Sequence, residues 1–98
     1  PRFAHPVFRT HPVTGRKALY VNRLMTERIE GLESAESDAI LDALFDHQEN
    51  PAWTYEHVWR VGDLLMWDNR STIHARTDFS PGERRLLRRS VVCGERPY

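Results

Sequence analysis

The apolar and polar residues in the middle of the chain alternate with the period of an amphipathic helix. Aspartates occupy one face of this pattern, and apolar residues recur at three- and four-residue spacing on the other. The apolar positions are Ile40, Leu41, Leu44 and Phe45. Ser34 is a residue type that commonly caps a helix, and Asn50-Pro51 is a typical helix stop. The pattern therefore predicts one helix from Ser34 to about His47.

The segment before this helix is predicted to be extended and to reverse once. Prolines follow His5 and His11, and a proline forces the residue before it into extended backbone. A turn at residues 13–16 would join two extended pieces, and residues 18–21 suit a short strand. We therefore expect both histidines to serve the extended segment and its turn, and not to bind a metal.

From Thr54 onward the chain alternates in the way that short β-strands do. Gly62-Asp63 marks one turn, and residues 80–83 (Ser-Pro-Gly-Glu) place proline and glycine at the two central positions of a type II turn. The predicted strands cover residues 54–61, 64–67, 71–77 and 84–93. The chain is thus predicted to be mostly β with one or two helices, and no linker divides it.

The turn at residues 80–83 decides which side chains of its two strands share a face. If the ends of the turn pair, His74 lies across from Arg89. Asp78 then lies across from Arg85. Because side chains alternate along a strand, His74, Arg85 and Arg89 would point the same way. The backbones of the two arginines would be about 13 Å apart, so they could grip opposite ends of a small dianion, or two different anions.

These residue types can bind a metal ion and anions. An imidazole nitrogen is a ligand for ferrous iron, zinc or copper, so His74 alone does not select the metal. The planar fork of an arginine meets a carboxylate or sulfonate with two parallel hydrogen bonds. Without further information, the alternative is a packed or exposed histidine beside a solvated basic edge.

Residues near the C-terminal end also resemble a known signature. They are Trp67-Asp68-Asn69-Arg70, His74, Asp78-Phe79, Arg85 and Arg89. This set resembles the C-terminal signature of the taurine and dichlorophenoxyacetate dioxygenases, which are ferrous-iron and 2-oxoglutarate-dependent enzymes. The spacing of eleven residues from His74 to Arg85, and of four more to Arg89, makes the resemblance specific. It extends upstream through Gly62-Asp63, the predicted helix and residues 9–22, and so covers nearly the whole chain.

The resemblance implies a double-stranded β-helix, or jelly roll, and a set of roles. His74 matches the distal histidine ligand of Fe(II), and Arg85 matches the arginine that pairs with the far carboxylate of 2-oxoglutarate. Arg89 matches a second arginine, which faces an anionic substrate group or the cosubstrate. The implied reaction uses O2, converts 2-oxoglutarate to succinate and CO2, and hydroxylates a small anionic substrate such as a sulfonate or aryloxyalkanoate, as in taurine catabolism.

The chain departs from the family in its iron ligands. The family takes two ligands from a His-x-Asp or His-x-Glu pair well upstream, and the only such match here is His47-Gln48-Glu49. Residues two apart on a helix point about 200° apart, so that pair cannot readily chelate one ion. It also lies too close to His74, and we interpret it as chance. Residues 1–98 are therefore expected to be the C-terminal part of a single catalytic domain, inactive alone.

The role of the loop residues before His74 stays open at this point. Asp68, Asn69 and Arg70 could order the loop by hydrogen bonds to the backbone. They could equally brace the second nitrogen of the histidine, as groups around metal ligands commonly do.

Composition narrows the partners. The 14 basic residues balance the 14 acidic ones, so no global field favours nucleic acid, and no apolar run is long enough to cross a bilayer. The single Cys93 fits a reducing cytoplasm. We expect a small anionic substrate as the partner, with a homo-oligomer possible. Two alternatives are a non-catalytic jelly-roll fragment and, with less support, a nucleic-acid-binding module that uses the arginines of residues 84–89.

Overall fold

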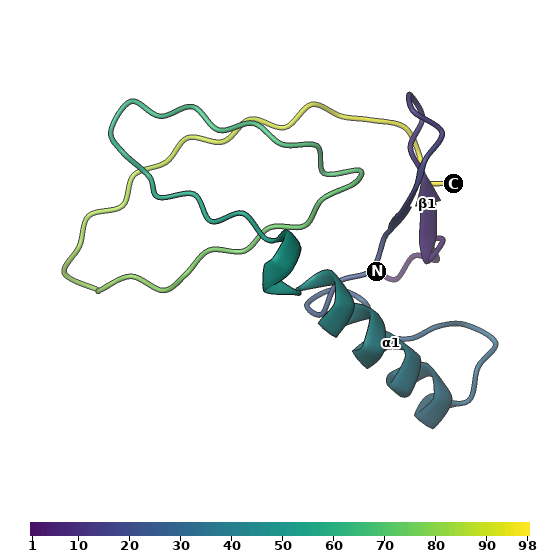
Figure 1. Cartoon of the computed structure of the whole chain (residues 1–98). Coiled ribbons are helices and arrows are strands. Elements are labelled where there is room, and N and C mark those ends of the chain that lie inside the picture. The colour runs from purple at the N-terminus through teal and green to yellow at the C-terminus, as the bar shows by residue number, and fades with distance from the viewer.

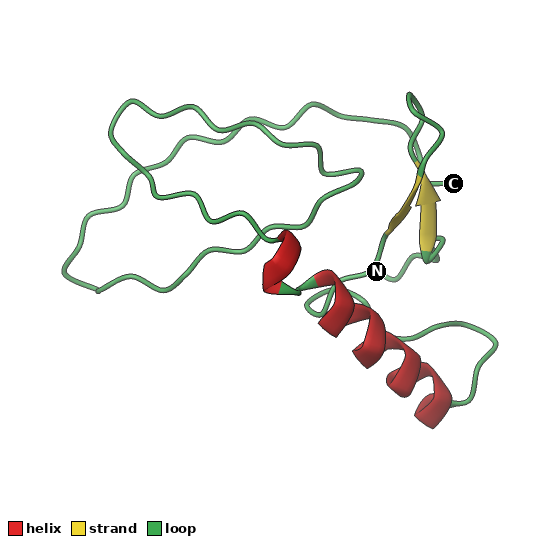
Figure 2. Cartoon of the chain, in the orientation of Figure 1, coloured by secondary structure: helices red, strands yellow, loops and turns green.

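A computed structural model describes all 98 residues. It contains a small hairpin, one long helix and a long C-terminal segment without regular elements (Figure 1). The elements in chain order are β1 (Phe8–Thr10), β2 (Lys17–Leu19), α1 (Ser34–Gln48) and the short 3-10 helix η1 (Pro51–Trp53). Figure 2 shows that loops connect these elements and make up the rest of the chain. No helix is both long enough and apolar enough to cross a membrane.

The hairpin confirms the predicted extended pieces and the reversal between them. β1 and β2 are antiparallel, and Arg9 lies opposite Ala18. The backbone amide of His11 donates to the carbonyl of Arg16 at 2.8 Å and closes the connection. Gly15 within it has a φ of 72°, a left-handed conformation that a glycine adopts without strain. The strand after the turn begins at Lys17 and ends at Leu19, close to the predicted run.

Helix α1 confirms the predicted helix to within one residue at its start. The cap position, however, is Glu33, which has extended backbone and makes no capping hydrogen bond with its side chain. Ser34 is therefore the first helical residue and not the cap. The face that contains Ser37, Leu41 and Phe45 is buried, because residues four apart lie above one another on a helix.

The core lies between α1 and the segment that leaves β2. Its three buried apolar residues are Val21, Leu41 and Phe45. Arg23 extends over the ring of Phe45, with its guanidinium carbon 5.0 Å from the ring centroid. The same guanidinium donates to Glu49 at the end of α1, with Nη2 and Oε2 2.8 Å apart. The segment after β2 is thus attached to the helix by packing and by an exposed ion pair, which solvent screens.

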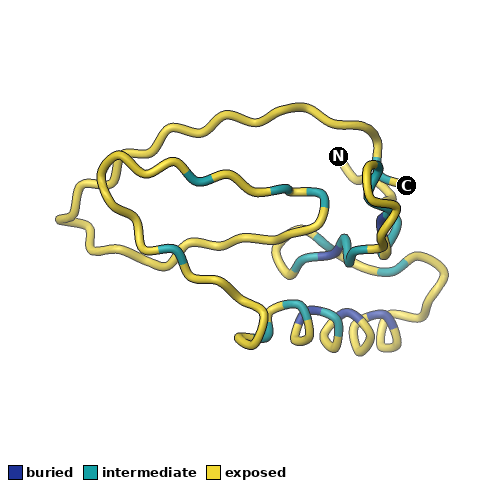
Figure 3. Tube along the Cα trace, turned by 45° about the horizontal axis from the view of Figure 1, so that its top comes forward, coloured by how far each residue is buried: buried dark blue, intermediate teal, exposed yellow.

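The strands predicted beyond residue 54 are not formed. Residues 54–98 contain no strand, and the chain runs outward and back as extended loops in Figure 1. The strands predicted for these residues are therefore absent from the structure. Apolar side chains stay exposed along the segment, for example Val61 at 108%, Leu64 at 89% and Val92 at 95% (Figure 3). Alternation predicts which side chains share a face, but a sheet also needs a neighbouring strand and a layer that covers its apolar face.

Both turns predicted in this segment are present. The amide of Asp63 donates to the carbonyl of Arg60 at 3.1 Å, and Gly62 has a φ of 90°. The amide of Glu83 donates to the carbonyl of Ser80 at 2.9 Å. Only three glycines have a positive φ, and Gly82 is not among them. The turn at residues 80–83 is therefore not type II, which requires a positive φ at its third residue.

Candidate functional site

His74 lies on an exposed loop, with its ring against an indole. The ring centroids of His74 and Trp67 are 4.7 Å apart and the ring planes are tilted by 52°. The indole nitrogen of Trp67 donates to Oδ1 of Asn69 at 2.8 Å, which holds the indole in place. The nitrogens of His74 make no hydrogen bond within the chain, so both are free to meet a metal ion or solvent.

Arg85 and Arg89 are exposed, and neither forms an ion pair within the chain. The guanidinium carbon of Arg85 lies 5.6 Å from the ring centroid of Phe79. An exposed cation over an aromatic ring is stabilised by about 0.5–1 kcal/mol. Both arginines are therefore available to an anion.

The predicted pairing across the turn is absent. No backbone hydrogen bond joins the segments on its two sides beyond the one that closes the turn itself. Asp78 pairs with Arg76 at 3.9 Å and not with Arg85. His74 does not pair with Arg89. The reason is the same as for the missing strands, because cross-strand neighbours exist only where a ladder fixes the register.

The structure adds a residue that the sequence did not connect to this loop, namely His11. Its Nε2 lies 2.9 Å from Oδ2 of Asp68, 57 positions along the chain. Its Nδ1 accepts the backbone amides of Val13 and Thr14, each at 3.2 Å. The expected turn role of His11 is thus present, and a contact with the 67–74 loop accompanies it. The sequence around His11 predicts only the turn, and not the contact with Asp68.

Asp68 and Arg70 form a bidentate pair within the loop. Nε of Arg70 lies 2.9 Å from Oδ1 of Asp68, and Nη2 lies 3.0 Å from Oδ2. The backbone amide of Arg70 also donates to Oδ1 at 2.9 Å. The hydrogen bonds from Arg70, and then the one from His11, hold the pKa of Asp68 well below its usual range. The carboxylate in turn raises the pKa of Arg70.

Asp68 also orders the backbone ahead of His74. Its carbonyl accepts the amides of Ser71 at 3.3 Å and Thr72 at 3.1 Å, and the hydroxyl of Thr72 at 2.7 Å. Of the two roles left open for the loop residues, the structure shows the first for Asp68, whose side chain accepts a backbone amide. The side chains of Asn69 and Arg70 bond to other side chains of the loop, and none of the three bonds to a nitrogen of His74.

A line of charges continues from this loop to the C-terminal residues. Glu95 lies 4.0 Å from Nη1 of Arg70 and 3.3 Å from Nη2 of Arg9, which is only 5% exposed. The amide of Thr10 donates to the carbonyl of Tyr98 at 2.7 Å. The C terminus therefore lies beside β1, as Figure 1 shows.

The pair His47 and Glu49 shows no arrangement for a metal. The ring of His47 packs 4.8 Å from that of Trp53, and Glu49 is engaged by Arg23. No group of three or more His, Cys, Asp or Glu side chains is placed to hold a metal ion. The described residues thus contain no complete set of metal ligands, and His74 fits a single ligand of a metal site.

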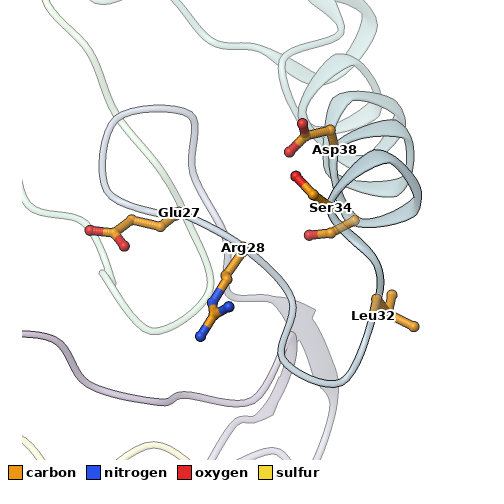
Figure 4. A pocket seen from close by; sticks show the side chains of 6 residues that line it. Glu27, Arg28, Leu32, Ser34 and Asp38 are labelled. Atoms are coloured by element: carbon orange, nitrogen blue, oxygen red, sulfur yellow. The ribbon is translucent and has the colours of Figure 1, made fainter.

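The remaining polar features are the side chain of His57 and a cavity beside α1. His57 lies 3.2 Å from Asp63, whose carboxylate also accepts the amide of Arg60 and so supports the turn at Gly62. A cavity of about 270 Å³ opens beside the start of α1. Figure 4 shows Glu27 and Arg28 extending away from Asp38 on the helix, so the charged groups of this cavity do not converge.

Comparison with known proteins decides the family. The model of the taurine catabolism dioxygenase TauD, TfdA family matches residues 1–91. The chain belongs to this family. The resemblance found in the sequence is therefore confirmed. No solved structure matches the chain.

The relatives are named for several different activities. Pentalenolactone F synthase of Streptomyces arenae is 42% identical over 93 residues, which is 95% of this chain and 31% of the relative. An alpha-ketoglutarate-dependent 2,4-dichlorophenoxyacetate dioxygenase of Burkholderia sp. is 40% identical over 98% of the chain and 32% of its own length. An alpha-ketoglutarate-dependent sulfate ester dioxygenase of Pseudomonas putida is 36% identical over 95% and 31%. The chain thus spans about a third of the curated relatives it matches.

Proposed function

We propose that residues 1–98 are the C-terminal part of the jelly-roll catalytic domain of an Fe(II)- and 2-oxoglutarate-dependent dioxygenase. The observation that carries this proposal is the family match over residues 1–91. The relatives include enzymes named as alpha-ketoglutarate-dependent dioxygenases. The free nitrogens of His74 and the unpaired Arg85 and Arg89 are compatible with it.

Each predicted residue has a distinct role in this proposal. His74 provides one imidazole ligand to ferrous iron, and the other two ligands come from outside this chain. Arg85 binds the far carboxylate of 2-oxoglutarate with its planar fork. If bound, ferrous iron would activate O2, which is the oxidant. One oxygen atom would enter the succinate formed from 2-oxoglutarate as CO2 is lost, and the other would hydroxylate a substrate C–H bond. What this chain contributes is therefore binding and orientation.

Arg89 is proposed to recognise the substrate, or to assist with the cosubstrate. It is exposed and has no acidic partner within the chain. Two relatives are named for dichlorophenoxyacetate and for sulfate esters, which are organic anions. A relative from Schizosaccharomyces pombe that is named for sulfonate dioxygenase activity is 42% identical over 97 residues. We therefore propose a small anionic organic substrate, such as a sulfonate or an aryloxyalkanoate.

The test is succinate formation by the full-length protein at limiting 2-oxoglutarate, with iron, ascorbate, oxygen and a panel of anionic substrates. A hydrogen bond to a charged group contributes about 1.5–3 kcal/mol, and 1.4 kcal/mol is tenfold. Arg85→Ala should therefore raise the KM for 2-oxoglutarate by about 10- to 100-fold. Arg84→Ala, one residue away and also exposed, is the matched control and should leave it unchanged. An unchanged KM in Arg85→Ala would refute the assignment of Arg85.

A further inference from the structure

His11 is held in one tautomer. Its Nδ1 accepts two backbone amides, from Val13 and Thr14. A ring nitrogen that accepts a hydrogen bond carries no proton, so the proton of the neutral ring lies on Nε2. Nε2 faces Oδ2 of Asp68 at 2.9 Å and donates to it. The turn after β1 therefore presents a fixed donor to the loop that leads to His74.

The acceptor is equally well fixed. Oδ1 of Asp68 accepts from the amide and Nε of Arg70, and Oδ2 accepts from Nη2 of Arg70 and from His11. Every bond but the one from His11 comes from within the loop itself. His11 is thus the direct attachment of the Asp68 carboxylate to another part of the chain.

The position of Asp68 affects His74 in two ways, through the backbone and through the Trp67 ring. On one side its carbonyl orders Ser71 and Thr72, so the backbone is fixed to within two residues of His74. On the other side its neighbour Trp67 packs against the ring of His74. A displacement of Asp68 would therefore move both the backbone and the ring contact of the histidine.

The second attachment of this loop is weaker. Nη1 of Arg70 lies as far as 4.0 Å from Glu95, and the side chains of both residues are about one-third exposed or more. The side chain of His11 is 11% exposed, and its bond to Asp68 is 2.9 Å long. Loss of the His11 contact would thus leave the loop tied to the hairpin by side chains only through this long, solvent-screened pair and the ion pair of Glu95 with Arg9.

We infer that His11 is a positioning residue, which acts through Asp68 to set the orientation of the His74 imidazole toward the metal. This inference rests on the proposed function, because it assumes that His74 binds a metal. His11 itself touches neither metal nor substrate. Its function is to hold the loop of residues 67–74 against the hairpin.

The test measures Co(II) binding by the full-length protein in calorimetric titrations, together with amide hydrogen exchange at Ser71 and Thr72. His11→Phe keeps a ring but removes both nitrogens, while His11→Gln keeps a donor near the place of Nε2. The matched control is His5→Phe, because His5 also precedes a proline in the same segment but has no bond to the loop.

We expect His11→Phe to weaken Co(II) binding about tenfold, at the lower end of effects for groups that orient metal ligands. Amide exchange at Ser71 and Thr72 should become faster in the same variant. His11→Gln should stay closer to the wild type than His11→Phe does, and His5→Phe should match the wild type. Because His11 acts through Asp68, the double variant His11→Phe/Asp68→Asn should bind Co(II) as tightly as the single variant Asp68→Asn does.

The possible failures are distinguishable. Should the wild type bind no Co(II), the proposed metal site is wrong, and this inference falls with it. If the wild type binds Co(II) and His11→Phe binds it equally well, only the positioning role is overturned. Faster amide exchange with unchanged Co(II) affinity also overturns it, because the loop would then loosen without effect on His74. Additive losses in the double variant would show that His11 does not act through Asp68.

Discussion

Asp68 illustrates how a single carboxylate connects distant parts of this chain. Its side chain accepts hydrogen bonds from Arg70 of the same loop and from His11 of the hairpin, and its carbonyl accepts one from Thr72. The local part of this arrangement could be predicted, since an aspartate commonly bonds the backbone two residues on. The bond to His11 could not, because no pattern in the sequence links two positions 57 residues apart.

The lowered pKa of Asp68 predicts the pH range over which this contact stabilises the chain. A carboxylate whose pKa falls on folding stabilises the folded state fully above its ordinary pKa of 3.8, and this contribution is lost as the pH falls through the lowered value. The difference in unfolding free energy between wild type and Asp68→Asn should therefore be constant from pH 7 to about 5 and shrink only below about 4. Urea unfolding at a series of pH values measures it. A difference that vanished by pH 5 would contradict the arrangement.

His74, Arg85 and Arg89 show a different limit of local information. Their spacing identified the family, which the match over residues 1–91 confirms. Their expected convergence on one face depended on a strand pairing that the structure lacks. The residue types and their spacing can be read from the sequence, whereas the convergence of the three side chains depends on tertiary contacts.

At the scale of elements, helix α1 was the most predictable part of the chain. Its apolar spacing, with the signals of Ser34 and Asn50-Pro51, predicted both ends to within one residue, and the helix runs from Ser34 to Gln48. The cap was misassigned because a serine favours the cap position, yet here the chain turns into the helix one residue earlier, at Glu33. The buried face depends on tertiary packing against Val21.

Two aliphatic side chains on α1 test this packing. Leu41 is 3% exposed and Ile40 is 39% exposed, although they are neighbours of equal size. Leu41→Ala should lower the unfolding free energy by about 2–5 kcal/mol, because it leaves a cavity and removes buried apolar surface. Ile40→Ala should cost less than half of that. Urea denaturation monitored by circular dichroism gives both values, and equal losses would contradict the assignment of the buried face.

The turns were better predicted than the strands they connect. A turn is encoded by the residues within it, such as the glycine at position 62 with its φ of 90°. A strand is encoded only in part by its own residues, because its hydrogen bonds belong to a neighbour. Residues 54–98 therefore contain the predicted reversals without the predicted sheet.

At the scale of the whole molecule, exposed apolar surface gathers in the C-terminal half. Val58, Leu86 and Val91 are exposed by 75%, 76% and 63%. Alternating apolar side chains of this kind are typical of strands with one covered face. The chain also spans only about a third of its relatives, and they match it throughout. We expect the remaining part of the domain to cover this surface.

This expectation predicts a difference in amide protection. In the full-length protein, residues 84–93 should pair in the proposed jelly roll, and their amides should exchange slowly. In the isolated chain of 98 residues the same amides have no partners and should exchange at nearly the rate of an unfolded peptide. Mass spectrometry of deuterium uptake in peptides from this segment compares the two. Equally fast exchange in both would refute the proposed jelly roll for this segment.

The proposed function depends most directly on whether His74 binds iron. Ferrous iron is titrated anaerobically into the full-length wild type, His74→Ala and the control His57→Ala, which removes a histidine that supports only a turn. We expect one tightly bound iron per chain in the wild type and in His57→Ala, and a loss of affinity of at least about 100-fold in His74→Ala, since three ligands define such a site. Equal iron affinity in the wild type and His74→Ala would contradict it.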